Sequence, residues 1–204
     1  MKQKTTSLIY SIAAVTLLSS MPSLHSATIV PDSYAFDGPA GSDPTGTAGG
    51  VASTLLSDDV ISTGAWNDGD NVYFNAGDTP AASMTFTFDD TYKFSTIVIY
   101  EHTQLINGIA NVDILTSVNG TDFSSATNYA IGAGTAVGGT AHAVEHSLDV
   151  SSLADAQYIR FNFVSAGGSW MTLTEIDFDG TAIPEPSTAI LGGLGLLALL
   201  RRRR

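Results

Sequence analysis

Four residues in Gly- and Asn-rich segments have side chains suited to binding a sugar. Trp66 and Asn67 lie in TGAWNDGDN, Tyr73 is the second residue after that segment, and Trp170 ends GGSW. Aromatic faces stack on the apolar faces of sugar rings, and amide groups form hydrogen bonds with hydroxyls. These residues are therefore candidates for a carbohydrate-binding site. Packing in the core or at a sheet edge is the alternative for both tryptophans.

Residues that could catalyse a reaction form no recognisable motif in this sequence. His142 and His146 would share a face of a strand, but the helical HExxH motif of zinc proteases is not present. The sequence also contains no GxSxG turn to expose a nucleophilic serine. Acidic residues are so frequent that spacing alone cannot identify a pair of glycosidase carboxylates. We therefore interpret the chain as a protein other than an enzyme, with a glycan-active hydrolase as an alternative.

Charge is unevenly distributed along the chain. There are 20 Asp and Glu against eight Lys and Arg, and six of the eight basic residues lie near the two ends. Residues 28–183 therefore carry a net charge of −17, which repels phosphate backbones and excludes nucleic acid as a partner. Acidic loops also offer oxygen ligands to calcium, with plain solubility as the alternative. The chain has no cysteine, so its stability depends on a core without disulfides.

Residues 1–27 are typical of a secretory signal peptide. Two lysines precede the apolar run LIYSIAAVTLLSS, and PSLHSA then offers Ser26 or Ala27 for cleavage. A permanent N-terminal anchor is the alternative, which the short apolar run disfavours. Residues 28–50 then combine a first strand, TIVPDSYAF, with a flexible segment rich in Gly, Pro, Ser and Thr.

Residues 51–182 have the periodicity of a β domain. In SMTFTFD, the side chains of Met84, Phe86 and Phe88 face one way and two threonines face the other. Alternating or β-branched segments recur at 94–101, 111–118, 143–150, 158–164 and 171–180. No amphipathic helical pattern of ten or more residues interrupts them. The sequence therefore predicts an all-β fold, with an antiparallel β-sandwich or jelly roll.

Three short motifs in this domain resemble those of discoidin, or coagulation-factor type C, domains. They are a hairpin S-x-[DN]-G-x-x-[FW] at Ser117, Asn119, Gly120 and Phe123, a strand Y-[IV]-R at Tyr158, Ile159 and Arg160, and a closing EI-x-x-x-G at Glu175, Ile176 and Gly180. The resemblance covers residues 51–180. It implies a galactose-binding-like β-sandwich, a group that includes many carbohydrate-binding modules, with its ligand loops at one end.

The same resemblance implies a structural calcium ion. In that family the ion often lies near an acidic segment before the first core strand and near the Glu of the last strand. The corresponding residues here are Asp58 or Asp59 and Glu175. Carboxylates from both ends of the domain would then hold the sandwich together. In the alternative interpretation, the two aspartates cap a turn and Glu175 pairs with Arg160.

The C-terminal segment IPEPSTAILGGLGLLALLRRRR has three parts. They are the stiff segment Pro184, Glu185, Pro186 and Ser187, the apolar residues 188–200, and the cluster Arg201, Arg202, Arg203 and Arg204. Thirteen apolar residues make about 20 Å of helix against a hydrocarbon core of roughly 30 Å, so the arginines would snorkel toward the interface. We predict a short C-terminal transmembrane helix with its arginines in the cytoplasm. A buried core helix is the alternative, which four terminal arginines disfavour.

This three-part order closely resembles the PEP-CTERM sorting signal of Gram-negative bacteria, and residues 183–204 are identified as such a tail. The resemblance implies a partner, an exosortase-type membrane protease that recognises Pro-Glu-Pro. By analogy with other processed tails, the apolar run is a temporary anchor in the inner membrane. We therefore expect an exported protein of the cell surface or extracellular matrix that binds glycans or polysaccharide. A structural matrix component without a defined ligand is the alternative.

Overall fold

The computed structural model describes residues 27–37, 56–62, 71–75, 83–102, 108–137, 142–166, 170–184 and 201. Ten β-strands lie in these ranges: β1 Ala27–Ile29, β2 Ser33–Asp37, β3 Val72–Asn75, β4 Ser83–His102, β5 Ile109–Ser117, β6 Thr127–Ala130, β7 Thr135–Ala136, β8 Ala143–Asp149, β9 Ala156–Ser165 and β10 Trp170–Ala182. All pairings between them are antiparallel. The predicted all-β fold is therefore confirmed.

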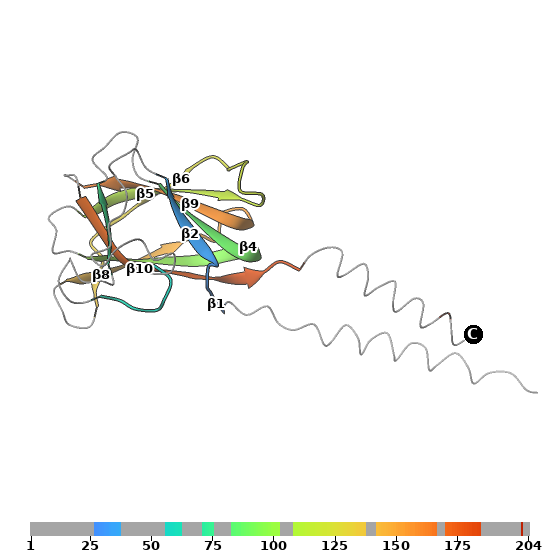
Figure 1. Cartoon of the computed structure of the whole chain (residues 1–204), viewed down its shortest axis with the longest axis horizontal. Helices are drawn as coiled ribbons and strands as arrows, with labels where there is room; N and C mark the ends of the chain where they lie inside the picture. Colours follow the sequence, from blue (N-terminus) through green and yellow to red (C-terminus); the bar gives the residue numbers. More distant parts are fainter. Residues whose placement is uncertain are drawn as a thin grey trace, which may run out of the picture.

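Strand β4 is 20 residues long and takes part in both layers of a sandwich. Residues 83–87 pair with β2 on one edge and β9 on the other, whereas residues 96–101 pair with β10 and β8. A register shift between Thr87 and Tyr92 marks the change of layer. One layer has the order β2-β4-β9-β5-β6 (Figure 1). The other has the order β10-β4-β8-β7, with β1 and β3 both on the outer edge of β10.

The burial pattern confirms the alternation predicted for the strands. In the first part of β4, Met84, Phe86 and Phe88 are buried and the two threonines between them are partly exposed. Strand β9 repeats this pattern with Ile159 and Phe161. Because successive side chains of a strand point to opposite faces, one face of each strand supplies the core.

Phenylalanines from both layers meet at the centre of the molecule. The ring centroid of Phe178 in β10 lies 5.1 Å from that of Phe86 in β4 and 6.1 Å from that of Phe161 in β9. Phe178 belongs to one layer, and Phe86 and Phe161 belong to the opposite layer. All three side chains are fully buried, and their rings are tilted relative to one another, a favourable arrangement for aromatic pairs. These contacts hold the layers together without a disulfide.

The turn between β5 and β6 has the chemistry predicted from Asn-Gly. Gly120 has a φ of 74°, and the side-chain oxygen of Asn119 accepts hydrogen bonds from the N–H groups of Thr121 and Asp122. A Cβ atom on Gly120 would lie 3.1 Å from the ring of Tyr158. Both the positive φ and this close approach favour glycine here.

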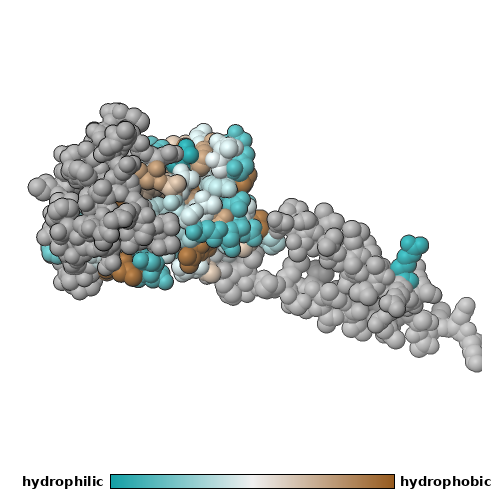
Figure 2. All heavy atoms as spheres, in the orientation of Figure 1, coloured by the Kyte–Doolittle hydropathy of each residue, from teal (hydrophilic) through white to brown (hydrophobic). Residues whose placement is uncertain are grey.

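Large apolar side chains are exposed at separate places on the described surface. Val30, Val60, Val118 and Val164 belong to different segments of the fold. Figure 2 shows hydrophilic and hydrophobic residues mixed together on the visible face of the sandwich. On the residues described, this face therefore has no large continuous apolar patch of the kind that partner proteins cover.

The predicted targeting segments fall almost entirely outside the described ranges. Residues 1–26 and 188–200 are not among them, and neither is the flexible segment 38–50. Within the ranges that the structure covers, no helix has the length and apolar character needed to cross a membrane.

Candidate functional site

Five strand ends meet at one end of the sandwich, which we call the loop end. They are the last residues of β4 and β9, His102 and Ser165, and the first residues of β5, β8 and β10, which are Ile109, Ala143 and Trp170. Pairings of His102 with Ala143 and of Ile109 with Ser165 hold these ends together. In Figure 1 the loop end lies on the left, beside the label of β8. Loops on a rigid sandwich are where binding residues usually occur.

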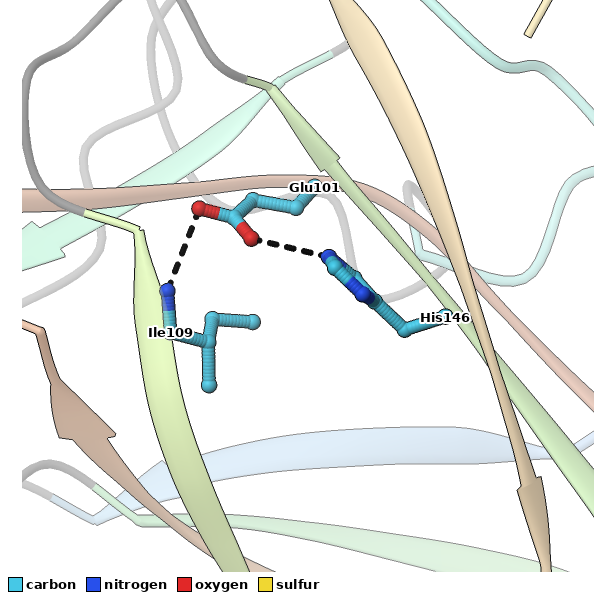
Figure 3. A network of polar contacts seen from close by, with 3 residues as sticks. All are labelled: Glu101, Ile109 and His146. Atoms are coloured by element: carbon cyan, nitrogen blue, oxygen red, sulfur yellow. Dashed lines mark hydrogen bonds and ion pairs between the residues drawn. The ribbon is translucent and has the colours of Figure 1, made fainter. Parts of the chain in front are cut away.

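A buried carboxyl group joins three strands just inside the loop end. Oε2 of Glu101 in β4 lies 3.0 Å from Nε2 of His146 in β8, and Oε1 accepts a hydrogen bond of 3.2 Å from the N–H of Ile109 in β5 (Figure 3). Glu101 is 5% exposed and His146 is 8% exposed. Because burying a polar group is costly unless it is hydrogen-bonded, both carboxyl oxygens need these partners. The contact fixes β4, β5 and β8 relative to one another.

Two glycines allow the backbone to approach this pair closely. A Cβ atom on Gly108 would lie 2.9 Å from Oε1 of Glu101. One on Gly134, in the segment before β7, would lie 2.4 Å from the carbonyl oxygen of Glu145 and 2.6 Å from Cε1 of His146. A larger residue at Gly134 would therefore push the chain away from β8.

The rings of His102 and His142 stack beside this pair. Their centroids are 5.7 Å apart and the ring planes differ by 13°. In the part of the chain that the structure describes, no group of three or more His, Cys, Asp or Glu side chains is placed to hold a metal ion.

A second buried carboxyl group lies in the centre of β10, beneath the turn 56–62. Glu175 is 1% exposed, and its Oε2 accepts a hydrogen bond of 3.3 Å from the N–H of Asp58. Its Oε1 is buried and has no hydrogen-bond partner among the residues described. Burial, together with the nearby carboxylates of Asp177 and Asp58, raises the pKa of Glu175 to about 8. The group therefore favours either a proton or a cation.

The turn itself is held in place by backbone and side-chain bonds. The carbonyl oxygen of Leu56 accepts a 3.0 Å hydrogen bond from the N–H of Ile176. Oδ1 of Asp58 accepts one of 3.1 Å from the N–H of Val60, and Asp59 has a φ of 62°, a value that aspartate tolerates. Both aspartates are exposed. The turn-capping role considered for Asp58 is thus found.

These residues fit the chemistry of calcium better than that of a transition metal. Oε1 of Glu175 is a buried oxygen without a hydrogen-bond partner among the residues described, and the turn bonded to this side chain carries the exposed carboxylates of Asp58 and Asp59. Calcium takes carboxylate and backbone oxygens in flexible geometry, so it does not require three acidic side chains. Glu175 and either Asp58 or Asp59 would hold it.

The alternative pairing of Glu175 with Arg160 is wrong. Arg160 lies in β9, in the other layer, and its Nε donates a 3.1 Å hydrogen bond to Oγ1 of Thr85. Its guanidinium carbon lies 4.0 Å from the centre of the Phe123 ring. The arginine of the discoidin-like Y-[IV]-R motif therefore packs against the phenylalanine of the discoidin-like hairpin.

The structure places two of the four candidate sugar-binding residues. Tyr73 lies in β3, opposite Thr172, and Trp170 begins β10, opposite Asn75. The backbones of these two aromatic residues are therefore close neighbours on paired strands at the loop end. Trp66 and Asn67 lie outside the described ranges.

The tail follows the last strand without a spacer. Pro184 is exposed and stands two residues after the end of β10. Of the remaining predicted sorting residues, the structure describes Arg201 alone. Glu185, Pro186, Ser187 and residues 202–204 lie outside its ranges.

Sequence reasoning missed Glu101 and the pairing of His146. One signal was present: the alternation of AVEHSLDV puts His146 on the same face as Leu148, which is buried. A polar ring on a buried face predicts a polar partner. That partner is 45 residues away in the sequence, and no local pattern identifies it.

The C-terminal tail matches a known sequence motif. Residues 182–204 match the PEP-CTERM protein-sorting motif. The PEP-CTERM motif implies a protein that is exported, sorted and processed by an exosortase. No curated protein matches this sequence.

The sandwich is similar to domains of solved structures. A mutant of the lectin binding domain of Lectinolysin, complexed with Lewis b, is 11% identical with a TM-score of 0.53, and the match covers 78% of this chain and all of that one. The C-terminal domain of a chitobiase from Bacteroides fragilis is 15% identical with a TM-score of 0.52, over 78% of this chain and all of that one. At these identities the likeness shows the fold alone. It confirms the antiparallel β-sandwich that the sequence predicts.

Proposed function

We propose that this PEP-CTERM protein is a carbohydrate-binding protein of the cell surface or extracellular matrix, and that it catalyses no reaction itself. The observation that carries the proposal is its sandwich fold. The lectin binding domain of Lectinolysin, whose structure contains Lewis b, has the same fold. In this chain the fold is combined with a motif for export and sorting.

The ligand binds at the loop end. Tyr73 and Trp170 are brought together there by the pairing of β3 with β10, and Trp66 and Asn67 supply further contacts. The buried pair of Glu101 and His146 joins the strands from which the neighbouring loops leave. A rigid base of this kind lowers the entropic cost of ordering loops around a ligand.

A structural calcium ion supports the sandwich away from this site. Glu175 and either Asp58 or Asp59 hold it, and the buried Oε1 of Glu175 is the observation in its favour. The ion supplies the positive charge that a buried carboxylate needs at neutral pH.

Replacing Trp170 by Ala tests the ligand site. We expect the variant to lose on the order of 1–3 kcal/mol of glycan-binding free energy and little of its free energy of unfolding. Tryptophan fluorescence during titration with Lewis b or galactose measures the first quantity, and urea denaturation measures the second. A loss of about 3–5 kcal/mol of stability would instead identify Trp170 as a packing residue.

The tail anchors the precursor in the inner membrane until an exosortase removes it. Its arginines are costly to translocate, so replacing Arg201–Arg204 by Ser is expected to weaken membrane retention. Fractionation of cells that express both forms measures the retained share. Equal retention of the two forms would contradict a stop made by these arginines.

A further inference from the structure

The sorting motif begins inside the folded sandwich. Strand β10 ends at Ala182, and the residues that match the motif begin at that same position. The N–H of Ile183 still donates a 2.8 Å hydrogen bond to the carbonyl oxygen of Thr91. Pro184 is the next residue. The first two residues of the matched segment are therefore bonded to β4.

Thr181–Ile183, which we call the terminal segment, is attached to the sandwich along one edge. Thr181 pairs with Lys93 and Ala182 pairs with Tyr92. On the opposite edge of β10, β1 pairs with residues 178–180 and no further. Among the residues described, no strand covers the outer edge of the terminal segment. A surface hollow of about 400 Å³ lies there, lined by β1 and by Gly180–Ala182.

An irregularity separates the terminal segment from the rest of β10. The register with β4 shifts between Asp179 and Gly180. A Cβ atom on Gly180 would lie 2.4 Å from the carbonyl oxygen of Lys93, so the backbones are in close contact there. Past this point few bonds hold the chain, and Ala182 is exposed. Strand ends with few buried contacts open at low free-energy cost.

The distance to the membrane is short. Four residues, Pro184 to Ser187, separate Ile183 from the apolar run. Fully extended, they span about 13 Å. A protease at the membrane surface therefore works directly beside the sandwich. Proteins that take up an extended segment commonly do so through its main-chain N–H and C=O groups, and in the terminal segment β4 occupies those groups.

We infer that the tail-processing protease takes up, through main-chain groups, the three residues that precede Pro184, which in this chain are Thr181–Ile183, and that processing therefore requires this stretch to be released from β4. The inference rests on the sorting role proposed above. In the reaction, water adds across one peptide bond of the tail. The body keeps the new carboxylate, and the membrane peptide keeps the new amino group. The stability of the terminal segment thereby sets the rate at which the precursor is processed.

A disulfide across the terminal segment tests this directly. Lys93→Cys with Thr181→Cys places thiols on register partners, whose Cα atoms are about 5.5 Å apart in an antiparallel pair and suit a disulfide. The chain has no other cysteine, and the change leaves residues 182–204 intact. In membranes that contain the full chain and the protease, we expect the oxidised variant to be processed at least about tenfold more slowly than its reduced form. The reduced form is the matched control.

Six residues, Gly-Ser-Gly-Ser-Gly-Ser, inserted between Ile183 and Pro184 should restore processing of the oxidised variant. A control chain with Glu185→Ala should not be processed if the sorting role holds. If that control behaves as expected but the oxidised and reduced forms are processed equally, this inference alone is overturned. Normal processing of the Glu185→Ala chain would overturn the sorting role, and the inference with it. Continued slow processing of the oxidised variant with the insertion would also overturn the inference, because a distant lock should then have no effect.

Discussion

In a buffer that contains a calcium chelator, the melting temperature of this protein is expected to fall as the pH rises from about 5 to about 9. Glu175 is the cause, because burial raises the pKa of its carboxyl group from 4.5 to about 8 in the folded state. The folded state thus binds the proton more tightly than the unfolded state does. The stabilisation is complete below the unfolded pKa and is lost as the pH rises through the folded pKa. The loss is on the order of 3–5 kcal/mol.

Replacing Glu175 by Gln separates this group from the others. The amide has a similar shape and does not titrate, so the melting temperature of the variant should change less across the same pH range. Asp177, whose pKa is also raised by burial, is present in both proteins and cancels in the comparison. Scanning calorimetry at several pH values measures the difference. Parallel curves for the two proteins would contradict the assignment to Glu175.

Calcium should reverse the effect in the parent protein. At about pH 8, added calcium should raise the melting temperature of the parent by mass action and leave that of Glu175→Gln nearly unchanged. An equal rise in both proteins would place the ion elsewhere. No rise in either would remove calcium from the account, while the pH dependence of Glu175 would still stand.

The second large effect is expected from Phe178→Ala. The ring of Phe178 contacts Phe86 and Phe161 of the opposite layer, so its removal leaves a cavity where the layers meet. We expect a loss of about 3–5 kcal/mol in the free energy of unfolding. Against a typical total of about 5–15 kcal/mol, this change leaves the sandwich marginally stable.

Phe123→Ala is the matched control for this substitution. It removes the same atoms from a partly exposed ring that packs on Arg160 at the surface. Urea denaturation of both variants should give a much smaller loss for Phe123→Ala. Similar losses at the two positions would mean that the contacts between the layers are not the main source of stability.

Local patterns were sufficient to predict the longer strands, but not the short strands β3, β6 and β7 or the path of β4. Alternation predicted buried Met84, Phe86 and Phe88 in one strand segment, and residues 94–101 were predicted as a separate one. The structure instead continues one strand from residue 83 to 102, with a register shift where it changes layer. Partners on four other strands decide that path, and sequence periodicity contains no information about them.

The same reasoning explains which site residues could be predicted. The resemblance to discoidin domains pointed to Glu175 and to either Asp58 or Asp59, and the structure brings the N–H of Asp58 to the carboxyl group of Glu175. It could not show that Arg160 lies in the opposite layer, because that depends on which strands pair. The contact between Glu101 and His146 was missed for the same reason, since strand pairing joins them across 45 residues.

Glycan binding by the intact protein is the most direct test of the central claim. The full chain in detergent, and its Trp170→Ala variant, would be applied to an array that includes Lewis b, galactose and fucose. We predict that the parent binds a restricted set of glycans and that the variant, with an unchanged melting temperature, loses this binding. If the correctly folded parent binds none of the glycans, the claim is contradicted, and a structural matrix component without a defined ligand becomes the better account.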